Sequence, residues 1–294
     1  MELRVLKYFL EVAREENITA AAESLHITQP TLSKQLMDLE NEMGKTLFIR
    51  GKRRITLTED GILLRKRAAE IIELVEKTES ELKNTNEIIV GDIYLGAAET
   101  DSMRAIADMC VNLYNKYPNI HYHLFSGNSE DVLEKLDKGL IDFGILLEPS
   151  DIKKYNYIKL PMSDTWGLLM RKDNPLAKKD YVSSKDLLDI PLLCSKQALE
   201  NNELNGWLET NIEKLNMVAT YNLIYNAALF VEQGLGSVIT LDKLVNVSDN
   251  SNLCFKPFSP TLKANLVLVW KKYQVFSKPA EKFLEHVTKN IKEK

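Results

Sequence analysis

Apolar residues recur three and four positions apart in three short segments at the start of the chain, the spacing that lines one face of a helix. These segments cover residues 2–16, 20–25 and 29–43. Asn17 offers an oxygen that can cap the second helix, Thr28 can cap the third, and Gly44 is placed to end it. The pattern therefore predicts three helices joined by tight turns.

The third segment, HITQPTLSKQLMDLE, has an unusually polar first turn. Leu32, Leu36 and Leu39 form its apolar stripe. The small or hydrogen-bonding residues of the first turn are Gln29, Pro30, Thr31, Ser33 and Lys34. Proline is tolerated there because the first turn has no intrahelical donor to lose. Short polar groups at the start of a helix are what a helix-turn-helix presents to base edges in the major groove, so we interpret this turn as a DNA-reading edge.

Two short β-type runs follow, LFIR at residues 47–50 and ITLT at residues 55–58, and they predict a hairpin. The residues that make its tip basic are Arg50, Lys52, Arg53 and Arg54. Positive side chains beside a recognition helix suit DNA phosphates or a narrow minor groove. A packing helix beside a solvated basic turn would explain each piece alone, but their joint order favours DNA binding.

A long helix is predicted from Glu59 to about Asn84, with Thr58 as its cap. Its apolar positions repeat at spacings of three and four, which is typical of the seam of a two-helix coiled coil. The residues assigned to this dimerisation seam are Leu64, Ala68, Ile71, Val75 and Leu82. The repeat therefore predicts a partner helix.

From about residue 88 the pattern changes to short apolar strands that alternate with amphipathic helices. Alternation of this kind is typical of an α/β domain with a largely parallel sheet. One series runs to Pro161, and a second series follows it and ends with the strand ANLVLVW and a terminal helix. We therefore predict a bilobed α/β domain.

Composition narrows the classes of protein. The 294 residues are 45% hydrophobic and 27% charged, which is ordinary for a globular protein. A net charge of -4 argues against coating of nucleic acid by the whole surface but allows a local basic patch. Three widely spaced cysteines suggest neither a disulfide framework nor a zinc site, and we expect no metal and no cofactor. Without an apolar run of roughly 20 residues, we expect a cytoplasmic protein with no membrane partner.

The segment NITAAAESLHITQPTLSKQLMDLENEMGKTLFIRGKRRITLTEDG resembles the winged helix-turn-helix of LysR-type transcriptional regulators. The matching residues are Thr19, Ala21, Ala22, Leu25, Gln29, Pro30, Leu32, Ser33, Gln35, Leu39, Glu40, Gly44, Leu47, Phe48, Arg50, Leu57, Thr58 and Gly61. Family members often carry a Gly-Ser pair and an aromatic residue where this chain has Glu16, Asn17 and Ile18. We expect that departure to affect packing more than DNA contact.

The resemblance implies a three-part organisation. Residues 1–58 would form a winged helix-turn-helix DNA-binding domain, residues 59–87 a dimerising linker helix, and residues 88–294 a periplasmic-binding-protein-like effector domain. Lobe I of that domain would contain residues 88–161 and 266–294, and lobe II residues 162–265. Similar proteins assemble as dimers or tetramers, and RNA polymerase would be a further partner.

In α/β lobes, ligands gather where the C-terminal ends of strands face the N-termini of helices. The three places of this kind provide the candidate effector-binding residues Thr100, Asp101, Ser102, Gly127, Asn128, Ser129, Ser195 and Lys196. Each of them could instead simply cap a helix. Helix N-termini favour anions, but the acidic residues beside these places leave a zwitterionic or neutral effector open: Glu99, Asp101, Glu130 and Asp131.

The principal hypothesis is a sequence-specific transcriptional regulator that binds double-stranded DNA and is controlled by a small-molecule effector held between the two lobes. The alternative is a small-molecule binding protein whose N-terminal region serves assembly rather than DNA reading. An enzyme is disfavoured, and no catalytic residue is proposed, because no Ser-His-Asp, Cys-His or paired-carboxylate order can be assigned.

Overall fold

The computed structural model describes residues 1–51, 54–83, 89–148, 152–200, 202–208 and 212–292. Contacts within the chain divide it into two compact units, Met1–Lys83 (unit 1) and Asn84–Lys294 (unit 2). Each unit has its own buried apolar core. Among the described residues, no helix is both long enough and apolar enough to span a membrane.

Unit 1 begins with three helices that share one core. They are α1 (Leu3–Glu15), α2 (Ile18–Ser24) and α3 (Gln29–Met43). Phe9 of α1 is fully buried, and its ring centroid lies 5.1 Å from that of Phe48. Leu32, Leu36 and Leu39 of α3 are buried in the same core. Because each such side chain contributes about 1.5–3 kcal/mol when it is fully buried, the leucine stripe fixes α3 in place.

Local signals set the ends of these helices as the sequence predicts. The Asn17 side chain accepts hydrogen bonds from the N–H groups of Thr19 (2.8 Å) and Ala20 (3.1 Å). Thr28 caps α3, and Gly44 follows its last residue with a φ of 61°. Glycine adopts this left-handed conformation without the steric cost that a Cβ atom would bring, which explains why α3 ends there.

A two-stranded antiparallel hairpin follows α3 and confirms the predicted wing. Its strands are β1 (Phe48–Arg50) and β2 (Ile55–Leu57). Glu40 of α3 ties the hairpin to the helix, because its Oε1 accepts hydrogen bonds from the N–H groups of Leu47 (2.7 Å) and Phe48 (3.2 Å). The hairpin is thus anchored to the helix that carries the polar first turn.

The long helix α4 (Glu59–Lys83) corrects the predicted dimer seam. Ala68 is fully buried in the core of unit 1, and Leu64 and Ile71 pack against that core. The assignment of Ala68 to a contact with a partner helix is therefore wrong, and Leu64 and Ile71 are mostly used within the chain. Apolar residues spaced three and four apart indicate an apolar stripe on a helix, but the spacing does not show which segment packs on it. Here α1 of the same chain packs on the first half of α4.

Lobe I of unit 2 has a parallel strand set covered by helices. Its elements are β3 (Gly91–Ala97), α5 (Met103–Lys116), β4 (Ile120–Ser126), α6 (Ser129–Asp137), β5 (Phe143–Leu147) and the C-terminal α10 (Lys278–Lys292). The strand order is β4-β3-β5, and an antiparallel strand follows β5. Phe143 lies at the centre of the core, with its ring centroid 4.9 Å from Phe276 and 5.1 Å from Phe283.

Lobe II repeats the alternation of strands and helices. Its elements are β7 (Leu192–Ser195), α7 (Lys196–Glu200), α8 (Asn202–Trp207), β8 (Met217–Tyr221), α9 (Ile224–Glu232), β9 (Ser237–Leu241) and β10 (Leu253–Pro257). Short 3₁₀ helices lie at Pro175–Lys178, Ser184–Leu187 and Ile212–Lys214. Strands β9, β7 and β8 run side by side, with β7 parallel to both neighbours.

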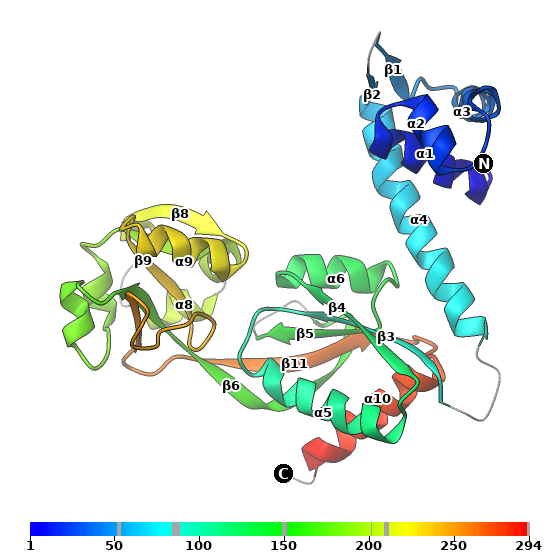
Figure 1. Cartoon of the computed structure of the whole chain (residues 1–294). Helices are drawn as coiled ribbons and strands as arrows, with labels where there is room; N and C mark the ends of the chain where they lie inside the picture. Colours follow the sequence, from blue (N-terminus) through cyan, green and yellow to red (C-terminus); the bar gives the residue numbers. More distant parts are fainter. Residues whose placement is uncertain (52–53, 84–88, 149–151, 201, 209–211, 293–294) are drawn as a thin grey trace. The chain divides into compact units, whose positions relative to one another are not determined.

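Two long antiparallel strands join the lobes, β6 (Tyr155–Arg171) and β11 (Lys263–Lys271) (Figure 1). The predicted strand TWGLLMR is the second half of β6, which pairs there with β9 and β10. Pro161 lies within β6, opposite a register shift between Asn265 and Val267 of β11. Proline lacks the N–H that a regular ladder requires, so this irregularity allows the strand to continue through it.

Gly61 provides a test of how closely α4 approaches the hairpin. A Cβ atom at this position would lie 2.2 Å from the carbonyl oxygen of Leu47, so Gly61→Ala should lower the free energy of unfolding of unit 1 by about 1–3 kcal/mol. The three tryptophans, Trp166, Trp207 and Trp270, all belong to unit 2. The loss should therefore appear in helical circular dichroism and leave the tryptophan fluorescence transition unchanged.

Gly44→Ala is the matched comparison. An added Cβ at Gly44 meets no atom within 4 Å, and only its positive φ opposes the change, so a loss of about 1 kcal/mol is expected. If Gly61→Ala costs no more than Gly44→Ala, the close approach of α4 to Leu47 is contradicted.

Candidate functional sites

The first turn of α3 is exposed on one side and anchored on the other. Gln29, Pro30, Thr31 and Lys34 are exposed, and Ser33 is half-buried. The leucine stripe on the opposite face of the helix is buried. The five residues predicted to bind DNA therefore lie together at the start of α3, and the backbone that carries them cannot shift without uncovering apolar side chains.

The basic hairpin is described only in part. Lys52 and Arg53 lie outside the described residues, and so does the side chain of Arg50. Arg54 forms an ion pair with Glu16, the residue that follows α1. The hydrogen bond from Arg54 lowers the pKa of the Glu16 carboxyl, which is therefore ionised at neutral pH. A DNA phosphate would compete with Glu16 for this guanidinium, so the departure from the family pattern at Glu16 affects the charge of the hairpin as well as packing.

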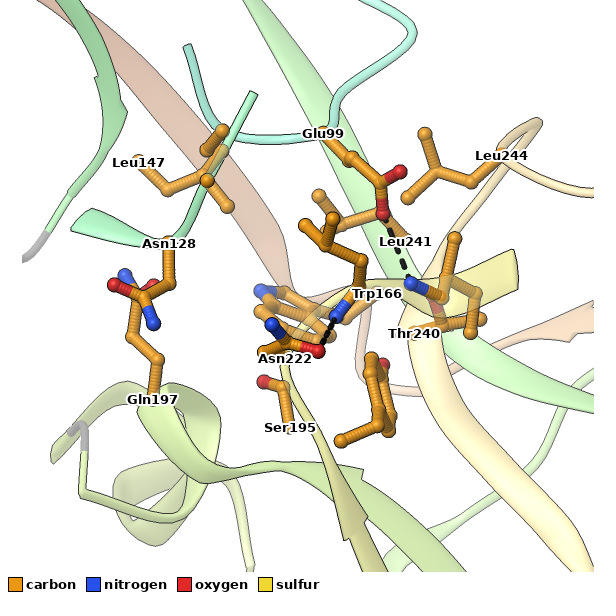
Figure 2. A pocket seen from close by; sticks show the side chains of 15 residues that line it. Glu99, Asn128, Leu147, Trp166, Ser195, Gln197, Asn222, Thr240, Leu241 and Leu244 are labelled. Atoms are coloured by element: carbon orange, nitrogen blue, oxygen red, sulfur yellow. Dashed lines mark hydrogen bonds between the residues drawn. The ribbon is translucent and has the colours of Figure 1, made fainter. Parts of the chain in front are cut away.

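A cavity of about 60 Å³ lies between the lobes of unit 2 (Figure 2). It has room for roughly four water molecules or a small ligand. Its polar lining consists of Glu99, Asn128, Ser195, Gln197, Asn222 and Thr240, which come from both lobes. Figure 2 shows these side chains around the same space, with Trp166 among them. The arrangement suits a ligand that contacts both lobes at once.

Three of the predicted effector-binding residues line this cavity, namely Gly127, Asn128 and Ser195. The residues that are not part of its lining are Thr100, Asp101, Ser102, Ser129 and Lys196. The ends of the strands thus lie beside the cavity, but the strand-end rule does not separate the residues that line it from those that do not.

Thr100 and Ser102 are engaged by a buried carboxylate instead of facing the cavity. Thr100 Oγ1 donates a hydrogen bond to Asp164, and Ser102 donates two to Asp164 Oδ1, from its Oγ (2.7 Å) and its N–H (3.2 Å). A buried carboxylate needs such donors, because burial without them is costly. Asp101 pairs with Arg104 at 2.6 Å. Thr100 and Ser102 therefore hold the loop after β3 against β6, while Asp101 is paired with α5.

Two hydrogen-bonded contacts join the lobes beside the cavity. Gln197 Nε2 donates to Ser129 Oγ (2.8 Å), and Gln197 Oε1 accepts from the Ser129 N–H (3.2 Å). Glu99 Oε2 accepts from the N–H of Ile224 at 2.9 Å, at the N-terminus of α9 (Figure 2). Any movement of one lobe away from the other must break or rearrange both contacts.

The sequence analysis missed several lining residues of lobe II. Tyr221 is the last residue of β8, and Asn222 follows it before α9, so the strand-end rule that identified Ser195 also applies to them. Tyr221 donates a hydrogen bond to the carbonyl of Ile239 at 2.8 Å, and burial raises the pKa of its hydroxyl, which stays neutral. The strand-end rule does not identify Trp166, because this residue lies within β6 and not at the end of a strand.

Comparison with protein families decides the class of the protein. A family model described as "Bacterial regulatory helix-turn-helix protein, lysR family" matches residues 3–62, and the model "LysR substrate binding domain" matches residues 89–292. The chain belongs to the LysR family. It is thus a DNA-binding transcriptional regulator with a winged helix-turn-helix and a periplasmic-binding-protein-like substrate-binding domain. This outcome favours the principal hypothesis over a protein whose N-terminal region serves assembly alone.

Relatives match over nearly their whole length. The Hca operon transcriptional activator HcaR of Escherichia coli is 26% identical over 288 residues, which are 95% of this chain and 94% of the relative. The hydrogen peroxide-inducible genes activator of Pectobacterium carotovorum is 26% identical, over 92% of this chain and 90% of that protein. Full-length CbnR, crystallised with its target DNA, has the same fold, with a TM-score of 0.76 at 20% identity over 98% of this chain and 99% of that chain.

The three free cysteines of this LysR-family protein are shielded to different degrees. Cys194 is buried, whereas Cys110 and Cys254 are partly buried. Burial raises the pKa of the Cys110 and Cys194 thiols to about 12. Because the thiolate is the reactive form of cysteine, both thiols should be protonated and unreactive at neutral pH.

We therefore expect selective labelling by N-ethylmaleimide at pH 7.5. In the native protein Cys254 should react first, and Cys110 and Cys194 should stay unmodified until denaturant exposes them. Mass spectrometry of peptides after timed labelling checks this order. Fast modification of Cys194 in the native protein would show that its thiol is ionised or accessible, contrary to this account.

Proposed function

We propose that the exposed first turn of α3 reads DNA sequence in the major groove. Gln29 can form two hydrogen bonds with an adenine, and the Thr31 methyl can contact a thymine methyl. Ser33 or Lys34 can bind a phosphate or a base acceptor, while Pro30 sets the entry of the helix. The observation that carries this proposal is the exposure of the polar turn opposite a buried leucine stripe.

The basic hairpin supplies the phosphate contacts of the same surface. Arg50, Lys52, Arg53 and Arg54 are assigned to the DNA backbone or the minor groove, where positive charge gives affinity without base specificity. Arg54 exchanges its contact with Glu16 for a phosphate when DNA binds. Neighbouring positive charges and the exposed edge of α3 together account for specific binding.

The cavity between the lobes is the effector site. Gly127, Asn128 and Ser195 keep the role predicted for them, and Gln197 and Asn222 join them. A ligand can shift an equilibrium between lobe settings only by its difference in affinity for them. An occupant that contacts both lobes provides such a difference. Of the other five predicted residues, Asp101, Ser102, Ser129 and Lys196 are assigned no ligand contact, and Thr100 lines a neighbouring hollow instead of the cavity.

Assembly involves the outer face of α4. Leu63, Leu74 and Leu82 of this helix are 58%, 41% and 73% exposed. We assign the contact with a second copy to these residues and to the half-buried Val75, in place of the buried Ala68. The regulator then acts as a homodimer or homotetramer on spaced half-sites, with RNA polymerase as its further partner.

A response to hydrogen peroxide is the second function that one relative's name raises. The raised pKa values of Cys110 and Cys194 do not favour it, because peroxide chemistry begins at an accessible thiolate. Control by a reversibly bound small molecule is therefore preferred.

Gln29→Ala tests the reading edge. We expect a loss on the order of 1–3 kcal/mol at a duplex selected by the wild-type protein from random sequences, because two hydrogen bonds to one base are lost. Affinity for random duplexes should stay unchanged, since phosphate contacts dominate it. Fluorescence anisotropy with both duplexes at one salt concentration measures the difference.

Asn41→Ala is the matched control, because it also removes an amide from an exposed position, but at the far end of α3. It should leave both affinities unchanged. Equal losses for Gln29→Ala on selected and random duplexes would contradict a base-reading role.

A further inference from the structure

The chemistry of the interlobe cavity is set by one acidic side chain. Among the described residues that line it, Glu99 is the one acidic residue, none is a lysine, arginine or histidine, and the others are neutral polar or apolar residues. The nearby Asp101 is already paired with Arg104 and lies close to Lys243, at 2.6 and 3.9 Å. The cavity is therefore negatively charged, with no cation in its described lining to balance it.

Glu99 also occupies the position that an anionic ligand would prefer. Helix N-termini attract anions through their free N–H groups. At the N-terminus of α9, however, the Ile224 N–H already donates to Glu99 Oε2 at 2.9 Å. A ligand carboxylate at this helix end would find the Ile224 N–H already bonded to Glu99, and it would lie close to a second carboxylate of the same charge. The protein's own carboxylate thus excludes the ligand class that the helix alone would attract.

The remaining lining suits a positive group. An ammonium ion has three donors and no acceptor. The same cavity is lined by side-chain oxygens of Asn128, Gln197 and Ser195. Each already accepts one hydrogen bond from a backbone N–H group and keeps a second lone pair as an acceptor. Trp166 adds an aromatic ring, which attracts cations through its π face. These acceptors and the Trp166 ring can therefore support a positive charge held by Glu99.

A neighbouring hollow indicates what else such a ligand carries. This hollow of about 270 Å³ shares Ala98, Glu99, Ile224 and Leu244 with the cavity. Thr100 also lines it, and Met103 and Phe125 add apolar surface to it. Glu99 thus lies where a polar cavity meets an apolar hollow. A ligand with its charge at Glu99 can place a short hydrocarbon group in the hollow and bury it there.

We propose that the effector is a small organic ammonium ion that pairs with Glu99 and carries a short apolar group. The inference rests on the proposed function, which places the effector between the lobes. Glu99 of lobe I accepts a hydrogen bond from the N–H of Ile224 of lobe II. A cation that pairs with the Glu99 carboxylate therefore changes a contact between the lobes. Ligand recognition and lobe setting are thereby coupled through one side chain.

The test uses the full-length protein and three matched probe series at pH 7 and constant ionic strength. The probes are straight-chain alkylammonium chlorides, the sodium carboxylates of the same chain length, and the corresponding amides, at the millimolar concentrations that ligands with so few atoms require. Calorimetry gives the affinity, and tryptophan fluorescence gives the melting temperature of unit 2. Ammonium probes should bind and raise that temperature, with butylammonium above methylammonium, and carboxylates should not.

Glu99→Gln removes the charge but keeps an oxygen that can accept from Ile224. It should weaken ammonium binding by roughly tenfold or more, as expected when an enclosed charge loses its partner. Asp101→Asn is the matched control, because this acid lies two residues away and outside the cavity lining, and it should retain wild-type affinity. Unchanged ammonium affinity in Glu99→Gln overturns the proposal.

Asn222→Trp separates failure of the ligand class from failure of the site. Asn222 is exposed and lines the cavity, so a large ring there should block entry and abolish ammonium binding. Carboxylates or amides that bind more tightly than the ammonium probes, and are blocked by Asn222→Trp, overturn the ligand class and leave the effector site in place. Probe binding that survives Asn222→Trp overturns the site itself. Absence of binding by every ammonium probe also overturns the inference.

Discussion

Burial of Leu32, Leu36 and Leu39 in the core of unit 1 is the interaction on which the proposed DNA reading by α3 depends. It fixes the rotation of α3 about its own axis, and that rotation decides which side chains face outward. The polar first turn is exposed because the leucines on the other face are not. The hairpin is tied to the same helix through Glu40, so the two parts of the proposed DNA surface share one support. An edge that must match a pattern of base acceptors needs such a support, since small displacements would break paired hydrogen bonds.

In the substrate-binding domain, polar contacts rather than apolar ones hold the elements around the candidate site in place. Its cavity lies between lobes joined by two long strands, and Ser129–Gln197 and Glu99–Ile224 are hydrogen-bonded across the gap. Residues that line the cavity thus also hold the lobes together. A ligand that competes for these groups acts directly on the lobe contact, and this gives a physical route from occupancy to the setting of the domain. Unit 2 therefore combines a cavity between two lobes, hydrogen bonds that join the lobes beside it, and two long strands that keep the lobes connected.

The sequence predicted most of the local structure, because helix ends depend on residues that are close in the chain. Asn17, Thr28 and Gly44 are examples, since each acts on atoms within a few positions. The dimer seam was partly wrong because an apolar stripe does not reveal whether its partner lies in the same chain, and α1 covers Ala68. Thr100 does not line the cavity for a related reason: its hydroxyl is hydrogen-bonded to Asp164, which lies 64 positions away in the chain. Residues such as these are recognised only when the fold brings distant strands together.

The central claim is that the first turn of α3 lies in the major groove, and directed cleavage of DNA tests it most directly. An iron chelate that generates hydroxyl radicals is attached to Lys34→Cys in a protein whose Cys254 is replaced by serine, since the other native thiols are shielded. The account predicts short clusters of cleavage centred on each half-site, separated by about 10 base pairs or a multiple of this. Cleavage spread evenly along the selected duplex, or no stronger than with the chelate at Asn41→Cys, would contradict it.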